Sequence, residues 1–358
     1  MPIQERLKVE LMENSDVLLV SEVIEIVREW VDLHARNLPD FAGAYLWGGI
    51  TALPMDAPFY LYRDVDVVVV LTHGAQDNEL EVFYRGLILE VIWKNLDAHQ
   101  NAEMILANPS HGPNMATTQI LADPTGILAP LHLKVASDYS RRRWIQARCD
   151  SEKATAQEWL INMLQAVTPL DRMVSVRVFL GALSGLLAVA QLERPTTRRT
   201  LALMRELLET QGRQDLHEVA LTVMGSAHMS RVDVQAMLDQ TMIAFDRAVE
   251  VYQTVIPYGF AIRSHVRPYH AEGTLEMIAE GNHREATFWI SCLDTAYLVL
   301  ENDAPDAEKP AFAADFEAIQ TALGYISAEV WMERVESAER LAREIYIIAD
   351  VLVALYTE

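Results

Sequence analysis

The chain has 358 residues, 51% of them hydrophobic, and a formal net charge of −22. This length predicts two domains, and the hydrophobic content excludes an intrinsically disordered chain. The strong negative charge argues against binding to duplex nucleic acid, because neutralising phosphates requires a basic surface. The charge favours solubility, and it also suits a cationic small molecule as partner.

The cysteine content and the apolar segments bear on the cellular location. Two cysteines, Cys149 and Cys292, support neither a disulfide framework nor a cysteine-based zinc site. The N-terminus lacks the apolar core of a signal peptide, so we expect a cytoplasmic protein. The longest apolar run, residues 178–192, falls short of the roughly 20 residues that a membrane-spanning helix needs. We therefore expect a buried helix there and no membrane partner.

The first predicted elements in chain order lead to a pair of glycines. Apolar residues over 16–35 recur at the spacing of one helical face, which predicts an amphipathic helix. A predicted strand over residues 41–47 then runs into Gly48 and Gly49. Glycines let the backbone approach a ligand closely, and amides at a helix start can hold phosphate oxygens. Gly48 and Gly49 are therefore candidates for binding phosphates.

Two aspartates, one residue apart, enter the next predicted strand, which is entirely aliphatic over residues 65–71. Residues two apart on a strand point to the same face, so Asp64 and Asp66 should project together. Their charges repel unless a cation lies between them, and such a pair suits a Mg²⁺ site for phosphoryl chemistry. The alternative is a glycine turn followed by a strand that happens to begin with two aspartates.

A hairpin is predicted next, with strands over 80–84 and 87–93 around a turn at Arg85-Gly86. Glu90 is the charged residue of the second, otherwise apolar segment, where an isolated charge is costly unless it is paired or bound to metal. We predict Glu90 as the third carboxylate of the site. Two alternatives stay open: Glu90 faces solvent by strand alternation, or Glu81 takes the third position.

The last part of the first predicted domain contains a helix, a loop, a short strand and a cluster of arginines. Residues 96–107 are predicted as a helix and 108–114 as a loop, before a short strand over 117–122. The densest positive charge follows at Arg141-Arg142-Arg143. We choose Arg141 as the candidate for contact with a triphosphate or a leaving pyrophosphate. The alternative for these arginines is a solvated helix start.

From residue 151 onward the sequence has helical periodicity and no strand pattern, which predicts an all-helical second domain. The fold class is therefore α+β, with domains at 1–150 and 151–358. The predicted helices cover 152–167, 171–193, 197–211, 215–228, 232–256, 274–300, 311–322 and 326–356. The aromatic and basic stretch 256–270 is predicted to be a non-helical connection, since it contains Pro268; a substrate- or base-stacking role is the alternative.

The order of these motifs resembles that of the nucleotidyltransferase superfamily. That family is marked by Gly-Gly or Gly-Ser after an apolar strand, then Asp-x-Asp or Asp-x-Glu in the next strand, and a third carboxylate in a later one. Gly48-Gly49, Asp64-x-Asp66 and Glu90 follow this order. The resemblance implies a polymerase-beta-like fold, with a mixed sheet and flanking helices ahead of the helical domain.

A second point of resemblance lies at residues 120–128, which are similar to the last strand and following helix of bacterial antibiotic-modifying nucleotidyltransferases. Together the two points cover roughly residues 15–150. The chain departs from the family pattern at Arg63, where a serine is common, and in the long loop between Gly49 and Asp64.

The resemblance implies a reaction in which a nucleoside monophosphate passes from a nucleoside triphosphate to a hydroxyl of a small-molecule acceptor, such as an aminoglycoside-like antibiotic, with release of pyrophosphate. Asp64 and Asp66 would hold two Mg²⁺ ions, and Glu90 would ligate metal or take the acceptor's proton. Arg63 and Arg141 are candidates for nucleotide contact. The alternatives are an inactive nucleotide-binding or regulatory protein and a nucleotidyltransferase that modifies a protein partner. The acceptor, the preferred base and the oligomeric state stay open.

Overall fold

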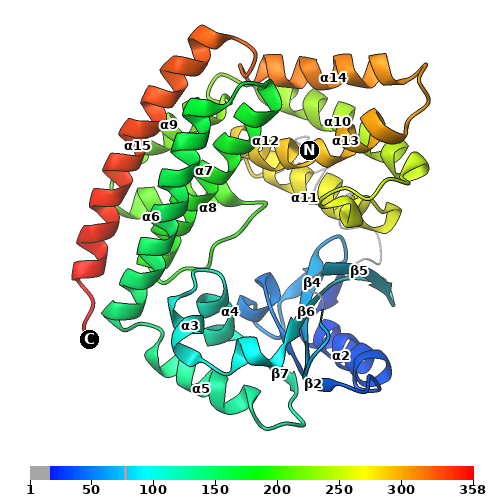
Figure 1. The fold of residues 1–358 in the computed structure, drawn as a ribbon, viewed down its shortest axis with the longest axis vertical. Coiled ribbons are helices and arrows are strands. Elements are labelled where there is room, and N and C mark those ends of the chain that lie inside the picture. The colour runs from blue at the N-terminus through cyan, green and yellow to red at the C-terminus, as the bar shows by residue number, and fades with distance from the viewer. Residues whose placement is uncertain (1–16, 76–78) are drawn as a thin grey trace, which may run out of the picture. The chain divides into compact units, whose positions relative to one another are not determined.

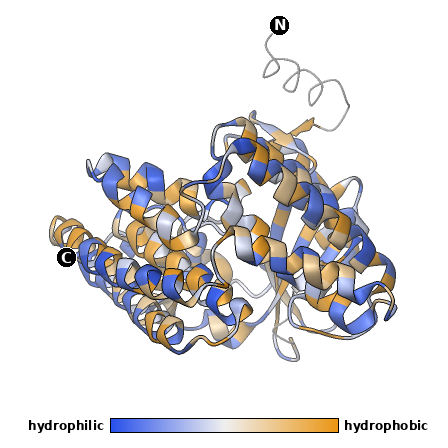
Figure 2. Ribbon diagram, turned by 90° about the horizontal axis from the view of Figure 1, so that it is seen from above, coloured by the Kyte–Doolittle hydropathy of each residue, from blue (hydrophilic) through white to orange (hydrophobic). Residues whose placement is uncertain are grey.

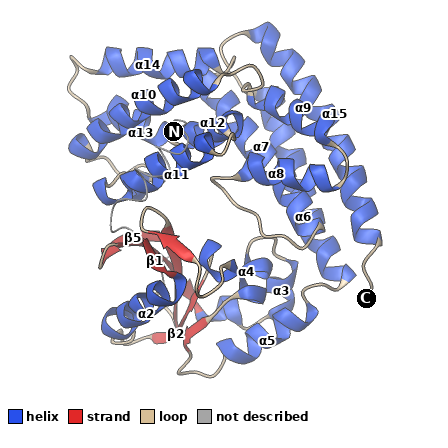
Figure 3. Cartoon of the chain, turned by 180° about the vertical axis from the view of Figure 1, so that it is seen from behind, coloured by secondary structure: helices blue, strands red, loops and turns tan. Residues whose placement is uncertain are grey.

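The computed structural model describes residues 17–75 and 79–358, which divide into two compact units. The sheet unit contains residues 17–105, 114–137 and 265–273, and the helical unit contains 106–113, 138–264 and 274–358. Every described strand belongs to the sheet unit (Figure 3). The α+β class is therefore confirmed, with an N-terminal mixed sheet and an all-helical C-terminal region.

The sheet unit is built on five strands in the order β5-β6-β4-β2-β7 (Figure 1). The central pair, β4 (Asp64–Leu71) and β6 (Leu87–Asn95), runs parallel, and the other neighbours run antiparallel. The remaining strands are β2 (Phe41–Leu46), β5 (Glu79–Tyr84) and β7 (Ile120–Ala122), with a separate antiparallel pair formed by β1 (Val17–Leu19) and β3 (Pro58–Tyr60).

One face of the sheet is buried under α2 (Val20–Trp30). The alternate residues Val65, Val67 and Val69 of β4 pack with apolar side chains of α2 in a single core cluster. Because strand residues alternate between faces, Asp64 and Asp66 must point to the opposite face. The predicted helix over 16–35 begins only at Val20, since residues 17–19 pair with β3, and it ends in a π-helical segment, Val31–Ala35. Asp16 lies outside the described residues.

The connections between the strands of the sheet unit agree only in part with the sequence predictions. Arg85 and Gly86 both have positive φ, 48° and 84°, as the predicted two-residue hairpin turn requires. The predicted helix over 96–107 is split into a 3₁₀ segment, Leu96–His99, and α3 (Ala102–Ala107). The predicted loop over 108–114 was wrong at its end, because α4 (His111–Thr117) begins there. Asn108 Oδ1 accepts hydrogen bonds from the amides of Ser110 and His111 at 2.9 and 2.7 Å and caps that helix.

The helical unit is built from long helices in which hydrophilic and hydrophobic residues are interspersed along the chain (Figure 2). After α5 (Leu128–Asp138), the helices are α6 (Arg142–Gln165), α7 (Pro169–Ala190), α8 (Thr200–Thr210), α9 (Gln214–Met224), α10 (Arg231–Val251), α11 (Arg267–Ala279), α12 (His283–Cys292), α13 (Asp294–Asp303), α14 (Lys309–Ala322) and α15 (Ala328–Ala354). The predicted domain boundary after residue 150 falls within α6.

Two helix predictions in this region need correction. The single helix predicted over 274–300 is three helices, and Gly281, with φ +92°, lies between the first two. The prediction that residues 256–270 are non-helical was wrong at its C-terminal end, because α11 starts at Arg267. Pro268 is tolerated there, since the first helical turn does not need its missing amide hydrogen.

The most apolar helix is α7, which begins with a capping box in which Thr168 and Asp171 satisfy each other's backbone amides. Within the described parts of the chain, α7 is the one helix whose length and hydropathy would fit a membrane span. However, 78% of its apolar window is buried inside the protein. That degree of burial is typical of a core helix, as predicted for residues 178–192.

Two buried side chains in the helical unit, Glu152 and His217, have pKa values shifted in opposite senses relative to about pH 5–6. Glu152 of α6 packs over Gly185 of α7 so closely that a Cβ on Gly185 would lie 2.7 Å from Glu152 Oε1. Burial raises the pKa of Glu152 to about 7. His217 of α9 is 3% exposed, with Nε2 lying 3.4 Å from Glu285 Oε1, and burial lowers its pKa to about 4. Each group therefore resists carrying its charge in the folded state.

These two groups predict opposite pH dependences of stability. Between about pH 4.5 and 6.5, folded Glu152 keeps a proton that the unfolded chain releases, so its contribution is lost as pH rises. Folded His217 lacks a proton that the unfolded chain binds, so its contribution is lost as pH falls. The free energy of unfolding of Glu152→Gln, relative to wild type, should therefore decrease as the pH is lowered. That of His217→Gln should decrease as the pH is raised toward neutral. Each change should amount to at most about 1.4 kcal/mol per pH unit. Urea unfolding across this range measures the slopes; parallel curves for all three proteins would contradict the prediction.

Candidate functional site

The three predicted carboxylates lie together on one face of the sheet. Asp64 and Asp66 begin β4, and the parallel register places Asp66 beside Glu90 and Asp64 beside Ile88 of β6. One oxygen from each of the three carboxylates lies within 4.8 Å of the others. All three residues are partly exposed. The face opposite α2 therefore presents an acidic triad to solvent.

This donor set fits a hard divalent cation. Mg²⁺ takes oxygen ligands in octahedral geometry at about 2.0–2.1 Å, so oxygens around one ion lie about 3–4 Å apart. The triad oxygens lie within 4.8 Å of one another, which is close to that spacing. Like charges on directly opposed strand positions destabilise a sheet, and a bound cation would remove this repulsion. Asp64, Asp66 and Glu90 are therefore the residues that would hold Mg²⁺.

Gly48 packs directly against one of these carboxylates. Its backbone has φ +69° and ψ −157°, a conformation that is essentially restricted to glycine. A Cβ at this position would lie 1.5 Å from Asp66 Oδ2 and 2.6 Å from its Cγ. The adjacent Trp47 amide donates a 2.9 Å hydrogen bond to the Asp66 carbonyl oxygen. A glycine is required here because the Asp66 side chain occupies the space of any other side chain.

The two glycines of the turn differ in what their backbones contact. The Gly48 amide donates a 2.9 Å hydrogen bond to Asn114 Oδ1, so it is engaged within the protein. Gly49 is exposed at the start of a 3₁₀ helix, Gly49–Ala52, and a Cβ built on it would meet nothing within 4 Å. Phosphate binding by this pair stays a prediction, and Gly49 is the glycine with open space around it.

The two arginines predicted to contact nucleotide are engaged with neighbouring side chains. Arg63 lies in the turn before β4, where its guanidinium carbon is 5.5 Å from the ring centroid of Tyr60 and 6.0 Å from that of Tyr62. Arg141 precedes α6 in the helical unit, where its Nε lies 3.1 Å from Oδ1 of the buried Asp138. Nucleotide contact by Arg63 and Arg141 stays a prediction.

The hairpin register also places Glu81 beside the triad. Glu81 of β5 is paired directly with Glu90, which is paired in turn with Asp66, so these residues form a row across three strands. Glu81 is not part of the group whose oxygens lie within 4.8 Å of one another. The structure therefore brings Glu90 together with the aspartates and places Glu81 on the outer side of Glu90.

A neutral pair lies further along the same face. Tyr45 is paired with Val68 in the register, and its hydroxyl lies 2.9 Å from His99 Nε2. His99 Nδ1 lies 3.1 Å from the Asn95 carbonyl oxygen, which can only accept, so Nδ1 carries the proton and Nε2 accepts from Tyr45. Burial lowers the pKa of His99 and raises that of Tyr45. The pair therefore adds no charge beside the acidic triad.

Sequence reasoning missed the segment that holds the glycine turn. Residues 114–119 contact it through Asn114 and also through Thr118, whose Oγ1 donates a 2.5 Å hydrogen bond to the Leu46 carbonyl. Leu46 in turn donates its amide to the Gln119 carbonyl at 3.0 Å. No motif marks these residues, and they lie about 70 positions from the turn in the chain.

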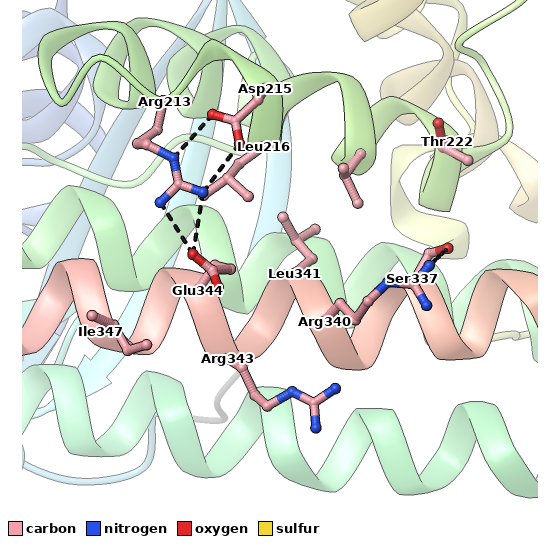
Figure 4. A pocket seen from close by; sticks show the side chains of 11 residues that line it. Arg213, Asp215, Leu216, Thr222, Ser337, Arg340, Leu341, Arg343, Glu344 and Ile347 are labelled. Atoms are coloured by element: carbon pink, nitrogen blue, oxygen red, sulfur yellow. Dashed lines mark hydrogen bonds and ion pairs between the residues drawn. The ribbon is translucent and has the colours of Figure 1, made fainter.

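The helical unit has a groove of about 590 Å³ between α9 and α15 (Figure 4). Arg213 donates hydrogen bonds at 3.0 Å to both oxygens of Asp215 and also contacts Glu344 at 3.1 Å. The floor is apolar, with Leu216 and Leu341. The Arg213 guanidinium is therefore engaged by a carboxylate from each of the two helices.

Among solved structures, the chain is similar to a nucleotidyltransferase-like protein from Exiguobacterium sibiricum 255-15. The similarity covers 84% of this chain and 89% of that chain, with 10% sequence identity and a TM-score of 0.32. The acidic triad is consistent with a nucleotidyltransferase active site. No protein-family model and no curated protein matches the chain.

Proposed function

We propose that this protein is a magnesium-dependent nucleotidyltransferase that moves a nucleoside monophosphate from a nucleoside triphosphate to a hydroxyl of a small-molecule acceptor. The observation that carries the proposal is the acidic triad, in which Asp64, Asp66 and Glu90 come from two parallel strands and have oxygens within 4.8 Å of one another. Three carboxylates that converge in this way supply the oxygen ligands that a hard divalent cation prefers.

The proposed reaction follows from the chemistry of these groups. The acceptor oxygen attacks the α-phosphorus, the bond from that phosphorus to the bridging oxygen breaks, and pyrophosphate leaves. Asp64 and Asp66 would hold Mg²⁺, which would neutralise charge on the phosphoryl oxygens when bound. Glu90 would accept the proton of the acceptor hydroxyl or supply a further metal ligand. The exposed backbone at Gly49 leaves room for a phosphate to approach.

The charge of the site favours a cationic acceptor. Glu81 extends the row of carboxylates beyond Glu90 on the same face, and the whole chain carries a net charge of −22. An acceptor that bears amino groups as well as hydroxyls, as aminoglycoside-like compounds do, would be attracted to such a face. We propose a cytoplasmic location, consistent with Cys149 and Cys292 both being free thiols.

The direct test is to incubate the protein with each labelled nucleoside triphosphate, Mg²⁺ and a panel of aminoglycosides, lincosamides and small metabolites, and to follow pyrophosphate. Release with one pairing supports the proposal and identifies the acceptor. Nucleotide binding without release under any pairing would favour the inactive regulatory protein, and transfer of label to a protein would identify a protein acceptor instead.

Asp64→Asn should abolish metal binding and turnover while leaving the fold intact, because it removes a ligand charge and relieves carboxylate repulsion. Thermal melting with and without Mg²⁺ plus nucleotide measures the effect: wild type should gain stability on binding and the variant should not. Asp56→Asn, an exposed aspartate in the loop before β3, serves as the matched control. A wild-type ligand-induced shift in Asp64→Asn would refute the assignment.

A further inference from the structure

The glycine turn beside the acidic triad is held by a buried asparagine. Asn114 of α4 is 5% exposed, and its Oδ1 accepts the Gly48 amide hydrogen at 2.9 Å. A second contact joins the same two segments, since Thr51 Oγ1 lies 3.0 Å from the Gly48 carbonyl oxygen and 3.3 Å from Thr117 Oγ1. The amide and the carbonyl of Gly48 are thus tied, directly or through Thr51, to residues of α4.

This arrangement matters because Gly48 has a conformation that it would not keep unaided. Glycine reaches φ values of either sign with little cost, so a free Gly-Gly turn samples many backbone states. A partly buried hydrogen bond favours one of them, since breaking it would leave the buried amide oxygen of Asn114 without this donor. Asn114 supplies that bond from a helix.

The selected state of Gly48 sets the space left for Asp66. One Cα hydrogen of Gly48 faces the Asp66 carboxylate, because a Cβ in its place would lie 1.5 Å from Oδ2. Movement of the turn toward the strand would push that oxygen aside. Movement away from the strand would let the Asp66 side chain adopt other rotamers. Active-site groups that bind metal need positions fixed within roughly 0.5 Å.

We propose that Asn114 is a positioning residue of the site: its hydrogen bond to Gly48 holds the glycine turn against Asp66 and so keeps that carboxylate oriented to bind Mg²⁺. The proposal rests on the proposed function, in which Asp66 is a metal ligand. Asn114 itself touches neither metal nor substrate in this assignment and acts through Gly48.

The test compares Asn114→Ala with a matched asparagine in the same unit. Asn95 at the last position of β6 also holds a backbone segment, with Oδ1 accepting from the Ala75 amide at 3.0 Å and Nδ2 donating to the Ala75 carbonyl at 3.1 Å. It lies at the opposite end of the parallel pair, beside Leu71. Asn95→Ala therefore removes a comparable brace far from Asp66.

Titration calorimetry with Mg²⁺ alone, and then with Mg²⁺ and nucleoside triphosphate, gives the readout alongside the melting temperature. We expect Asn114→Ala to weaken Mg²⁺ binding by about 10- to 100-fold, which is the loss typical when a residue that orients a metal ligand is removed. Asn95→Ala should lower the melting temperature similarly but keep wild-type affinity. Asn114→Asp, whose carboxylate oxygen can still accept from Gly48, should recover most of the affinity.

The outcomes separate this proposal from the proposed function. If wild-type protein binds neither Mg²⁺ nor nucleotide, the proposed function fails. If wild type binds and Asn114→Ala binds equally well, or if Asn95→Ala loses as much affinity, the proposed function stands and Asn114 is only a structural residue. Poor recovery in Asn114→Asp would likewise overturn the role assigned to its hydrogen-bond acceptor.

Discussion

Glu90→Gln should lower turnover by about 10²–10⁴-fold while nucleotide binding changes little, which is the loss typical of removing a positioned base. Glutamine keeps the size and most of the hydrogen bonding of glutamate but loses its charge and basicity. The structure supports choosing Glu90, because its carboxylate lies with Asp64 and Asp66 on one face of the parallel pair. Steady-state kinetics with the nucleotide and acceptor found in the pyrophosphate assay would measure the effect.

Glu81→Gln is the matched comparison for that experiment. Glu81 lies directly opposite Glu90 on β5 and outside the group of close oxygens, so its variant should turn over at nearly the wild-type rate. A larger loss in Glu81→Gln than in Glu90→Gln would assign the third carboxylate to β5. Equal and small losses would remove both glutamates from the chemistry.

Gly48→Ala should abolish Mg²⁺ binding and lower turnover by more than about 10²-fold, in line with the cost of displacing an active-site group. The new methyl group would lie 1.5 Å from Asp66 Oδ2, so the carboxylate must leave its place. The backbone conformation of Gly48, φ +69° and ψ −157°, adds strain of about 1–3 kcal/mol, since residues other than glycine rarely adopt it. Calorimetry with Mg²⁺ and thermal melting would follow the two effects.

Gly126→Ala separates strain from displacement. Gly126 has the same φ of +69° in the turn after β7, and a Cβ there would meet nothing within 4 Å. This variant should lose stability through its backbone alone and keep wild-type Mg²⁺ affinity. If Gly126→Ala also lost metal binding, a general loosening of the unit, and not contact with Asp66, would explain the behaviour of Gly48→Ala.

The pattern of local residues was enough to predict the acidic pair and its setting. That Asp64 and Asp66 share a face follows from the two-residue period of a strand, which depends on no distant contact. The turn at Arg85-Gly86 is equally local, because two residues with positive φ suit the twist of a tight hairpin. The aliphatic run of β4 predicted its burial between neighbouring strands in the same way.

Long-range pairing decided what local patterns left open. The choice between Glu90 and Glu81 depended on which strand lies beside β4, and the parallel register of β6 with β4 brings Glu90 to the aspartates. Residues 17–19 have helical periodicity, yet they are a strand because β3 offers hydrogen-bonding partners. Pairing of this kind depends on residues tens of positions away.

The amino-acid sequence by itself thus determined the α+β class, the place of Asp64 and Asp66 on one strand face and the candidacy of Glu90, since periodicity and turn chemistry are properties of neighbouring residues. Tertiary structure alone decided that Gly48 packs on Asp66 and that Asn114, 66 residues further along the chain, holds it there. A hydrogen bond between a backbone amide and a distant side chain produces no periodic pattern in the amino-acid sequence. It forms only once the chain has folded and both groups are withdrawn from water.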